Sequence, residues 1–196
     1  MAPMSSPDQQ PLEAAHRQVL LETARASLGH GVEHGEAPPV RAADYPAALQ
    51  AWRATFVTLR TDEDLRGCIG SCEAVRALVE DVSHNAFAAG FLDPRFPSLE
   101  ERELAGVRIH VSILSPLEPL DCTSAEELVT VVRPGVDGLL LEEGRHRGTL
   151  LPAVWDVLPE PAAFVRHLRL KAGLPADYWS SKLAVFRYTT ESFAEA

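Results

Sequence analysis

The segment Leu65–Gly70, with the sequence LRGCIG, combines a thiol, a guanidinium group and two glycines. If the segment is an extended strand, Arg66 and Cys68 share a face and lie about 6.6 Å apart along the chain. A cation at that distance favours the thiolate and makes a cysteine more reactive. Gly67 and Gly70 weaken a strand unless another group approaches closely, and their backbone N–H groups could cradle an anion. The alternative is that Cys68 is a small buried hydrophobic residue beside turn glycines.

A second segment with chemical potential is Phe91–Pro97, which has the sequence FLDPRFP and follows the strongest helical periodicity of the chain. Its two prolines fix two backbone φ angles, which suits a loop that must hold charged groups in place. We therefore predict that the loop holds Asp93 and Arg95 in place at a site, with its two phenylalanines able to anchor the segment. The alternative is a simple turn in which Asp93 is a cap and Arg95 a surface residue, because Asp-Pro is a common turn former.

His110 lies on the polar face of a predicted strand, beside Arg108 and Ser112. It could act as a base for Cys68 if this face borders the cysteine, because a Cys-His pair requires contact. It could equally be a strand residue that faces solvent.

The cysteines and histidines do not follow a known metal-binding spacing. Cys68 and Cys72 are spaced C-x-x-x-C, but the third cysteine of a radical S-adenosylmethionine enzyme is absent. Zinc would need Cys122 and a distant histidine, without the paired spacing of structural sites. His30 and His34 are four residues apart in a stretch that we expect to be a glycine-rich loop, where helical metal-binding geometry does not apply. We predict no metal site, and no motif identifies a cofactor.

Hydrophobic periodicity, capping residues and glycine or proline breaks divide the chain into helices and short strands. The first helix is expected to begin at Ser6-Pro7 and to stop at Gly29–Gly31. The predicted helices cover residues 6–28, 73–90, 98–106, 124–132 and 161–173, and the predicted strands cover residues 54–59, 65–70, 107–113, 139–142, 149–151 and 183–188. Capping boxes are expected at Ser98 with Glu101 and at Ser124 with Glu127. Hairpins between helices, without regular βαβ alternation, predict an α+β fold with a mostly antiparallel sheet and flanking helices.

Length and charge restrict the organisation and the partners of the chain. Its 196 residues predict one domain with room for two lobes, which we place at residues 9–196 after a tail of residues 1–8. The net charge of −10 opposes nonspecific nucleic-acid binding. Residues 144–190 are locally basic, with seven Lys or Arg against three Asp or Glu. Arg166, Arg169 and Lys171 in this segment could equally form one solvated helix face.

Three cysteines and a polar, proline-rich N-terminal stretch without a secretory hydrophobic region fit reduced thiols in the cytoplasm. No apolar run approaches the roughly 18 residues that a membrane-spanning helix needs. We therefore expect a cytoplasmic location and no membrane partner.

Several short motifs, in order and spacing from about Ala14 to Tyr188, resemble the AMMECR domain family, and in particular its bacterial branch, called AmmeMemoRadiSam system protein A. The motifs are LRGCIG at residues 65–70, Asn85-Ala86, DPRF at 93–96, VSILS at 111–115, PGVDG at 134–138, LLP at 150–152 with Val154-Trp155, and KAGLP at 171–175.

The resemblance implies a compact α+β domain with a cleft near the LRGCIG motif. It also implies association with a Memo-like protein and a radical S-adenosylmethionine protein. The family has no settled reaction. The positions carried over from its motifs are Arg66, Gly67, Cys68, Gly70, Asp93, Arg95 and Phe96.

Two functional hypotheses follow. In the first, the protein is a cysteine-dependent enzyme in which Arg66 activates Cys68 while Asp93 and Arg95 bind the polar end of a small substrate. In the second, it is a non-catalytic protein that docks on a Memo-like or radical S-adenosylmethionine partner, and the LRGCIG motif shapes the binding cleft. RNA binding through the basic segment is disfavoured by the net charge.

Overall fold

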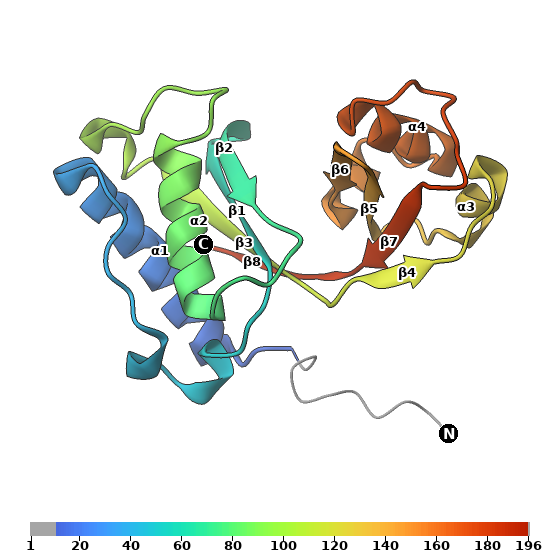
Figure 1. Ribbon diagram of the computed structural model, residues 1–196. Helices are drawn as coiled ribbons and strands as arrows, with labels where there is room; N and C mark the ends of the chain where they lie inside the picture. Colours follow the sequence, from blue (N-terminus) through green and yellow to red (C-terminus); the bar gives the residue numbers. More distant parts are fainter. Residues whose placement is uncertain (1–10, 196) are drawn as a thin grey trace. The chain divides into compact units, whose positions relative to one another are not determined.

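The structure is a computed structural model that describes residues 11–195. The described residues divide into two compact units, the first formed by the residues up to Leu114 together with those from Glu191 onward, and the second by Ser115–Thr190. Each unit has a four-stranded sheet with helices packed against it, which confirms the predicted α+β class (Figure 1). The predicted tail, residues 1–8, lies outside the described residues. None of the described helices is long and apolar enough to cross a membrane.

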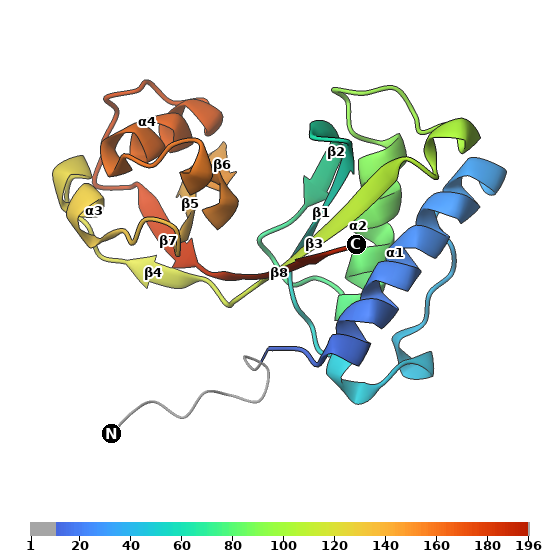
Figure 2. The ribbon, with the colours of Figure 1, turned by 180° about the vertical axis from the view of Figure 1, so that it is seen from behind.

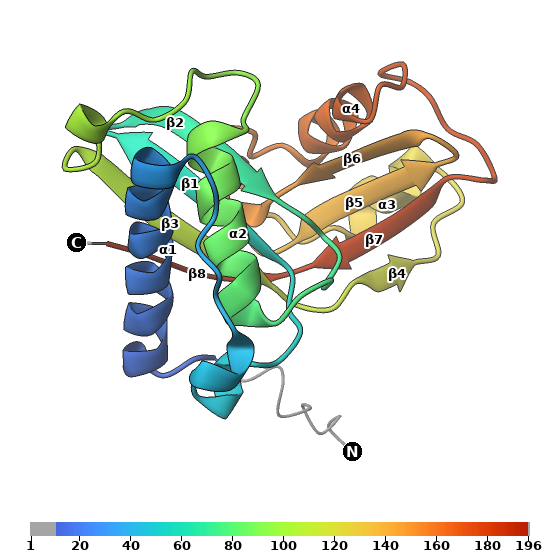
Figure 3. The same cartoon turned by 60° about the vertical axis from the view of Figure 1, so that its left-hand side comes forward.

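The first unit has the strand order β2-β1-β3-β8, and its two long helices cover one face of this sheet (Figures 1 and 3). Strands β1 and β2 form an antiparallel hairpin, and β1 also pairs antiparallel with β3. The bounds are α1 (Ala14–His34), β1 (Thr55–Thr61), β2 (Asp64–Gly70), α2 (Leu78–Phe91), β3 (Val107–Leu114) and β8 (Thr190–Ala194).

Strand β3 shows how the sequence selects the two faces of this sheet. Its alternate residues are buried in the core that the sheet forms with α1 and α2, as the pattern predicts, namely Val107, Ile109, Val111 and Ile113. The residues between them point to the opposite face. No helix of the described part of the first unit covers that face, which we call the open face.

The second unit has the strand order β4-β7-β5-β6, with α4 packed on β5 and β6 (Figure 2). Trp155 stacks on Phe164 in its core, with ring centroids 3.8 Å apart. Ser124 caps α3 by accepting the Glu127 N–H, and α4 begins at Pro161, so both helix starts are confirmed. The bounds are β4 (Glu118–Leu120), α3 (Ala125–Val131), β5 (Gly138–Glu143), β6 (His146–Leu150), α4 (Pro161–Lys171) and β7 (Ala184–Tyr188).

The expected end of the first helix at Gly29–Gly31 is wrong. Helix α1 continues to His34 and ends at Gly35, whose φ of 72° is left-handed. Gly31 does not stop the helix because it lies where α1 crosses α2, and a Cβ there would overlap the ring of Phe91. The glycine therefore serves helix packing. The expected start at Ser6-Pro7 falls outside the described residues, among which the helix begins at Ala14.

The expected start of the second helix near Glu73 is also wrong. Helix α2 begins at Leu78, whose N–H donates to the Ala51 carbonyl oxygen at 2.8 Å. Ala77 forms a β-bridge with Trp52. Ala77, the residue directly before α2, is held in extended form because it pairs with the chain that precedes β1.

Two edge strands and one capping box differ from the expectations. Strands β4 and β8 are not foreseen by the pattern, since both are short edge strands without clear hydrophobic alternation. The capping box after α2 is formed by Glu100 and Glu103 instead of Ser98 and Glu101, because the short helix begins at Glu101.

Candidate functional site

Three polar side chains form one row across the open face of the first sheet. Thr58 on β1 lies opposite Cys68 on β2 and also opposite His110 on β3. Residues paired in this way point to the same side of a sheet. All three are half-buried. The sequence connects Cys68 with His110 only as a hypothesis, and nothing in it marks Thr58 as the residue between them.

Thr58, and not His110, is the hydrogen-bond partner of the thiol, because its Oγ1 donates to Cys68 Sγ at 3.3 Å. His110 is two strands away, about 9 to 10 Å at the usual strand spacing, so the two residues do not form a direct pair. Burial lowers the pKa of His110, and the charges of Arg60 and Arg108 lower it further. The imidazole is therefore neutral at pH 7 and able to accept a proton.

The open face is also cationic. Arg60 on β1 lies opposite Arg108 on β3. Each is two residues along its strand from the row of Thr58 and His110, and therefore points to the same face. The strand residues that the register of β1, β2 and β3 places on this face include no carboxylate. This is a local exception in a chain with a net charge of −10.

Asp93 and Arg95 form a clamp on the backbone of Cys68. The Asp93 carboxylate accepts the Cys68 N–H at 2.9 Å, and Arg95 Nη2 donates to the Cys68 carbonyl oxygen at 3.3 Å. Arg95 also donates to both oxygens of Asp93, at 2.9 and 2.6 Å. Because β2 is an edge strand, these bonds satisfy groups that no further strand pairs.

The clamp fixes the charge of Asp93. Only 4% of this residue is exposed. Hydrogen bonds from Arg95, and then from the backbone of Cys68, hold the pKa of the Asp93 carboxyl far below its usual range. The guanidinium of Arg95 also lies 5.4 Å from the ring centroid of Phe96. The structure thus brings the two predicted motifs together, with Asp93 and Arg95 directed at the backbone of Cys68.

Arg66 is bound to Glu103, a residue that the sequence analysis did not single out. Its Nε and Nη2 donate to the two carboxylate oxygens at 2.7 and 3.1 Å, and the Arg66 side chain is largely buried. A bulge in the β1–β2 pairing falls at this point of the strand. The guanidinium is therefore neutralised by a carboxylate, which weakens its expected effect on the thiol of Cys68.

The two glycines of the LRGCIG motif are required by close packing. A Cβ at Gly67 would overlap the carbonyl oxygen of Ala89 on α2, and one at Gly70 would overlap the carbonyl oxygen of Thr55. Both neighbours are backbone atoms that cannot move aside. The expectation that these glycines precede a helix and expose N–H groups to an anion is not met, because α2 begins only at Leu78.

A buried polar network lies at the start of α2, and of its residues the sequence motifs include only Asn85. Asp81 accepts hydrogen bonds from the Thr55 hydroxyl at 2.6 Å and from the Asn85 amide at 2.9 Å. Burial raises the pKa of Asp81, although Thr55 and Arg76 counteract it. Thr55 also accepts the Ser71 N–H at 3.1 Å through its carbonyl oxygen. The network thus fixes the end of β2 behind the motif.

The possible metal ligands are placed differently from the expectation. His30 and His34 lie on α1, with ring centroids 4.3 Å apart, because the helix continues past Gly31. The reason for rejecting them as a helical pair is therefore wrong. Cys72 is buried and Cys122 belongs to the second unit. Among the described residues, no group of three or more histidine, cysteine or acidic side chains is arranged to hold a metal ion.

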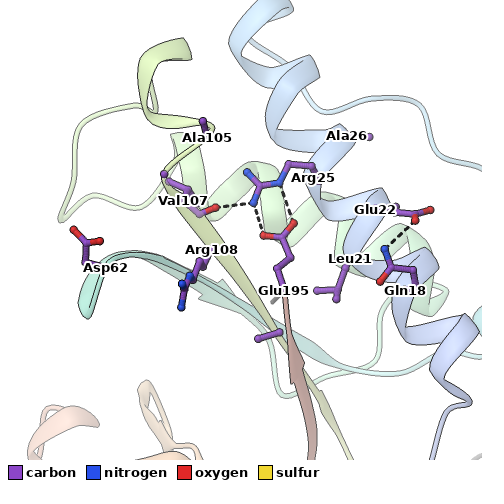
Figure 4. A pocket seen from close by; sticks show the side chains of 12 residues that line it. Gln18, Leu21, Glu22, Arg25, Ala26, Asp62, Ala105, Val107, Arg108 and Glu195 are labelled. Carbon is purple, nitrogen blue, oxygen red and sulfur yellow. Dashed lines mark hydrogen bonds and ion pairs between the residues drawn. The ribbon is translucent and has the colours of Figure 1, made fainter.

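A large open pocket of about 1010 Å³ lies between α1, the start of β3 and the end of β8 (Figure 4). Arg25 donates to the carbonyl oxygens of Leu104 and Val107 at 2.7 and 2.6 Å and pairs with Glu195. Cys68 does not line this pocket, so it is not the cleft that the resemblance implies. Through its ion pair with Glu195, Arg25 links α1 to the chain at the end of β8. No sequence pattern predicts this role.

The basic segment does not form a single solvated helix face. Arg169 is only 6% exposed, and its Nη1 donates to the Ala176 carbonyl oxygen at 2.6 Å. Burial lowers the pKa of Arg169. Arg166 and Lys171 are exposed on the same helix.

Fold and site together define an α+β protein in which a clamped edge strand presents a thiol on a polar, cationic sheet face. The chain belongs to the AMMECR1 family, whose model matches residues 21–193.

Relatives of similar length support this assignment. A protein of Methanothermobacter thermautotrophicus is 38% identical over 158 residues, which cover 78% of this chain and 80% of the relative. A protein of Thermofilum pendens is 38% identical over 202 residues, which cover 94% of this chain and 92% of the relative. The crystal structure of the uncharacterized protein PH0010 from Pyrococcus horikoshii matches with a TM-score of 0.81 and 32% identity, covering 90% of this chain and 89% of that one. These relatives are archaeal, and they do not support a bacterial branch.

Proposed function

We propose that the open face of the first unit binds a small anionic molecule and that Cys68 is the nucleophile that reacts with it or anchors it. The carrying observation is the placement of a half-buried thiol, hydrogen-bonded by Thr58, on a face with Arg60 and Arg108 and without a strand carboxylate. The two arginines would receive the negative charge of the ligand. Asp93 and Arg95 act as positioning residues, since they hold the backbone of Cys68.

Paired alkylation rates test this proposal without a known substrate. The same thiolate attacks iodoacetate and iodoacetamide and displaces iodide from each, but only iodoacetate is anionic, so a cationic face raises its relative rate. Peptide mass spectrometry of the native protein would follow Cys68, Cys72 and Cys122 separately. Cys122 is an internal control, because burial raises the pKa of its thiol and the charges of Glu127 and Asp121 raise it further.

We expect the iodoacetate to iodoacetamide rate ratio to be at least about threefold higher at Cys68 than at Cys122, and to fall with added salt. Arg108→Gln should reduce the ratio at Cys68 and leave that at Cys122 unchanged. Equal ratios at the two cysteines, or a Cys68 that reacts only after unfolding, would contradict the proposal.

Docking on a partner is the second candidate. Exposed apolar side chains occur in both motif segments, with Leu65 at the start of LRGCIG and Leu92, 60% exposed, directly before Asp93. Such side chains are typical anchors of an interface. We propose a Memo-like protein or a radical S-adenosylmethionine protein as the partner, in keeping with the AmmeMemoRadiSam resemblance. A cytoplasmic location fits both candidates, because Cys68 must remain reduced.

Titration calorimetry with each proposed partner at tens of micromolar would detect such docking. Leu92→Glu should abolish the heat of binding, whereas Val157→Glu, at an exposed position of the second unit, should leave it unchanged. No heat with either partner, or equal binding by both variants, would exclude docking through the motif segments.

A further inference from the structure

A second, smaller pocket lies within the second unit. It has a volume of about 670 Å³ and is lined by the β5–β6 turn and by the segment after α4. This volume falls in the range of small-molecule sites, about 300 to 1,000 Å³. Gly144, with a φ of 58°, makes the turn tight, so β6 begins at His146, earlier than the sequence predicts. The turn therefore projects Arg145 beside the pocket.

Two cations at this pocket have no side-chain partner. Arg145 in the β5–β6 turn and Lys182 in the segment after α4 both line it, and both are exposed. Neither side chain has a hydrogen bond or ion pair among the described residues. Nearby Arg147, by contrast, pairs with Glu142 at 2.8 Å. The cations at the pocket are thus available to an external anion.

The single carboxylate that lines the pocket is engaged by the protein. Glu143 accepts hydrogen bonds from the Tyr178 hydroxyl at 3.1 Å and from the Ser180 hydroxyl at 2.8 Å. Glu143 therefore holds the segment that contains Tyr178 and Ser180 in place, and Tyr178 forms one wall of the pocket. His146 is oriented by its Nδ1, which lies 3.2 Å from the Ala172 carbonyl oxygen. With Nδ1 as the donor, Nε2 is left for a ligand.

We infer that this pocket binds a small phosphomonoester with a compact apolar body. Arg145 and Lys182 receive the phosphate, whose double negative charge matches the two cations that line the pocket. Leu174 and Pro175 supply the apolar wall for the body of the molecule. The site belongs to the basic stretch of residues 144–190 and is independent of Cys68.

The test measures the binding of three probes to the full chain by titration calorimetry and by amide chemical shifts. Phenyl phosphate has both the anion and the apolar body, inorganic phosphate has only the anion, and phenol has only the body. We expect phenyl phosphate to bind most tightly and to shift the amides of Gly144 and Gly173. Arg145→Gln and Lys182→Gln should each raise its Kd by at least about fivefold, because each removes a charge-assisted contact.

A control variant and the amide shifts separate this site from other cationic surfaces. Arg166→Gln removes an exposed cation of the second unit outside the pocket and should leave the Kd of phenyl phosphate unchanged. Binding of phenyl phosphate to the open face of the first unit alone would leave the amides of Gly144 and Gly173 unshifted. An unchanged Kd in the Arg145→Gln, Lys182→Gln double variant, or no binding to the wild type at about 10 mM, would overturn the inference.

Discussion

In the first unit the charged residues of the two motifs are held in ion pairs, whereas in the second unit Arg145 and Lys182 have no side-chain partner among the described residues. Asp93 with Arg95 and Arg66 with Glu103 form ion pairs that determine where the edge strand lies. The cations of the second pocket determine no such geometry. The charged residues of the two motifs therefore build the site, while the charges of the second pocket remain available to a ligand.

The largest effect is expected from Gly67→Ala, which tests whether the motif glycine serves packing. The added Cβ would overlap the backbone of Ala89, so we expect a loss of about 3 kcal/mol in the free energy of unfolding, measured in urea. Gly29→Ala is the matched control. Gly29 lies within α1, and a Cβ there would meet no atom within 4 Å. This variant should stabilise the protein by about 1 kcal/mol. If Gly67→Ala leaves the free energy of unfolding unchanged, packing does not require the glycine, and the ligand-binding role expected from the sequence would be the better explanation.

Asp93→Ala tests the clamp and should cost about 2 to 3 kcal/mol of unfolding free energy. It leaves the Cys68 N–H without its partner and Arg95 without its carboxylate. Asp44→Ala, which breaks an exposed pair with Arg41, should cost no more than about 0.5 kcal/mol in the same urea titration. Similar losses in the two variants would show that the clamp does not order the edge strand.

The pH dependence of stability sharpens the same point. Because the folded pKa of Asp93 is depressed, its stabilising effect is fully present above the unfolded pKa near 3.9 and is lost as pH falls toward the folded value. The stability difference between wild type and Asp93→Asn should therefore be constant from pH 5 to 7 and shrink below about pH 4. Urea titrations at each pH measure it, and a difference that grows in acid would contradict the assigned charge state.

The smallest effect is expected from Thr58→Val, which removes the hydroxyl that donates to the thiol. The shape of the side chain is retained, so stability should change by less than about 1 kcal/mol. Alkylation of Cys68 by iodoacetamide at pH 7.5 should slow about two- to fivefold, because the sulfur loses the hydroxyl group that donates a hydrogen bond to it. Thr61→Val, on the same strand, is the control and should leave the rate unchanged. If Cys68 is alkylated at the same rate in Thr58→Val as in the wild type, Thr58 does not contribute to the site.

Local patterns in the chain were sufficient for much of the fold. Alternation predicted β3, the Ser124 capping residue predicted α3, and Pro161 predicted the start of α4. These features depend on neighbours within a few residues, so a single sequence displays them. The motif residues Cys68 and Asp93 were also identified from the sequence, through the resemblance and through their unusual composition.

Only the tertiary structure decided what these residues contact. Asp93 and Arg95 are 25 and 27 residues from Cys68, and Glu103 is 37 residues from Arg66, so no local spacing reveals the clamp or the Arg66–Glu103 pair. The same holds for glycine, since Gly31 and Gly67 look like breaks in the sequence but permit the close approach of α2. Polar pairing and close packing depend on groups that meet only when distant segments fold together, which is the physical reason that the sequence could name the residues but not their roles.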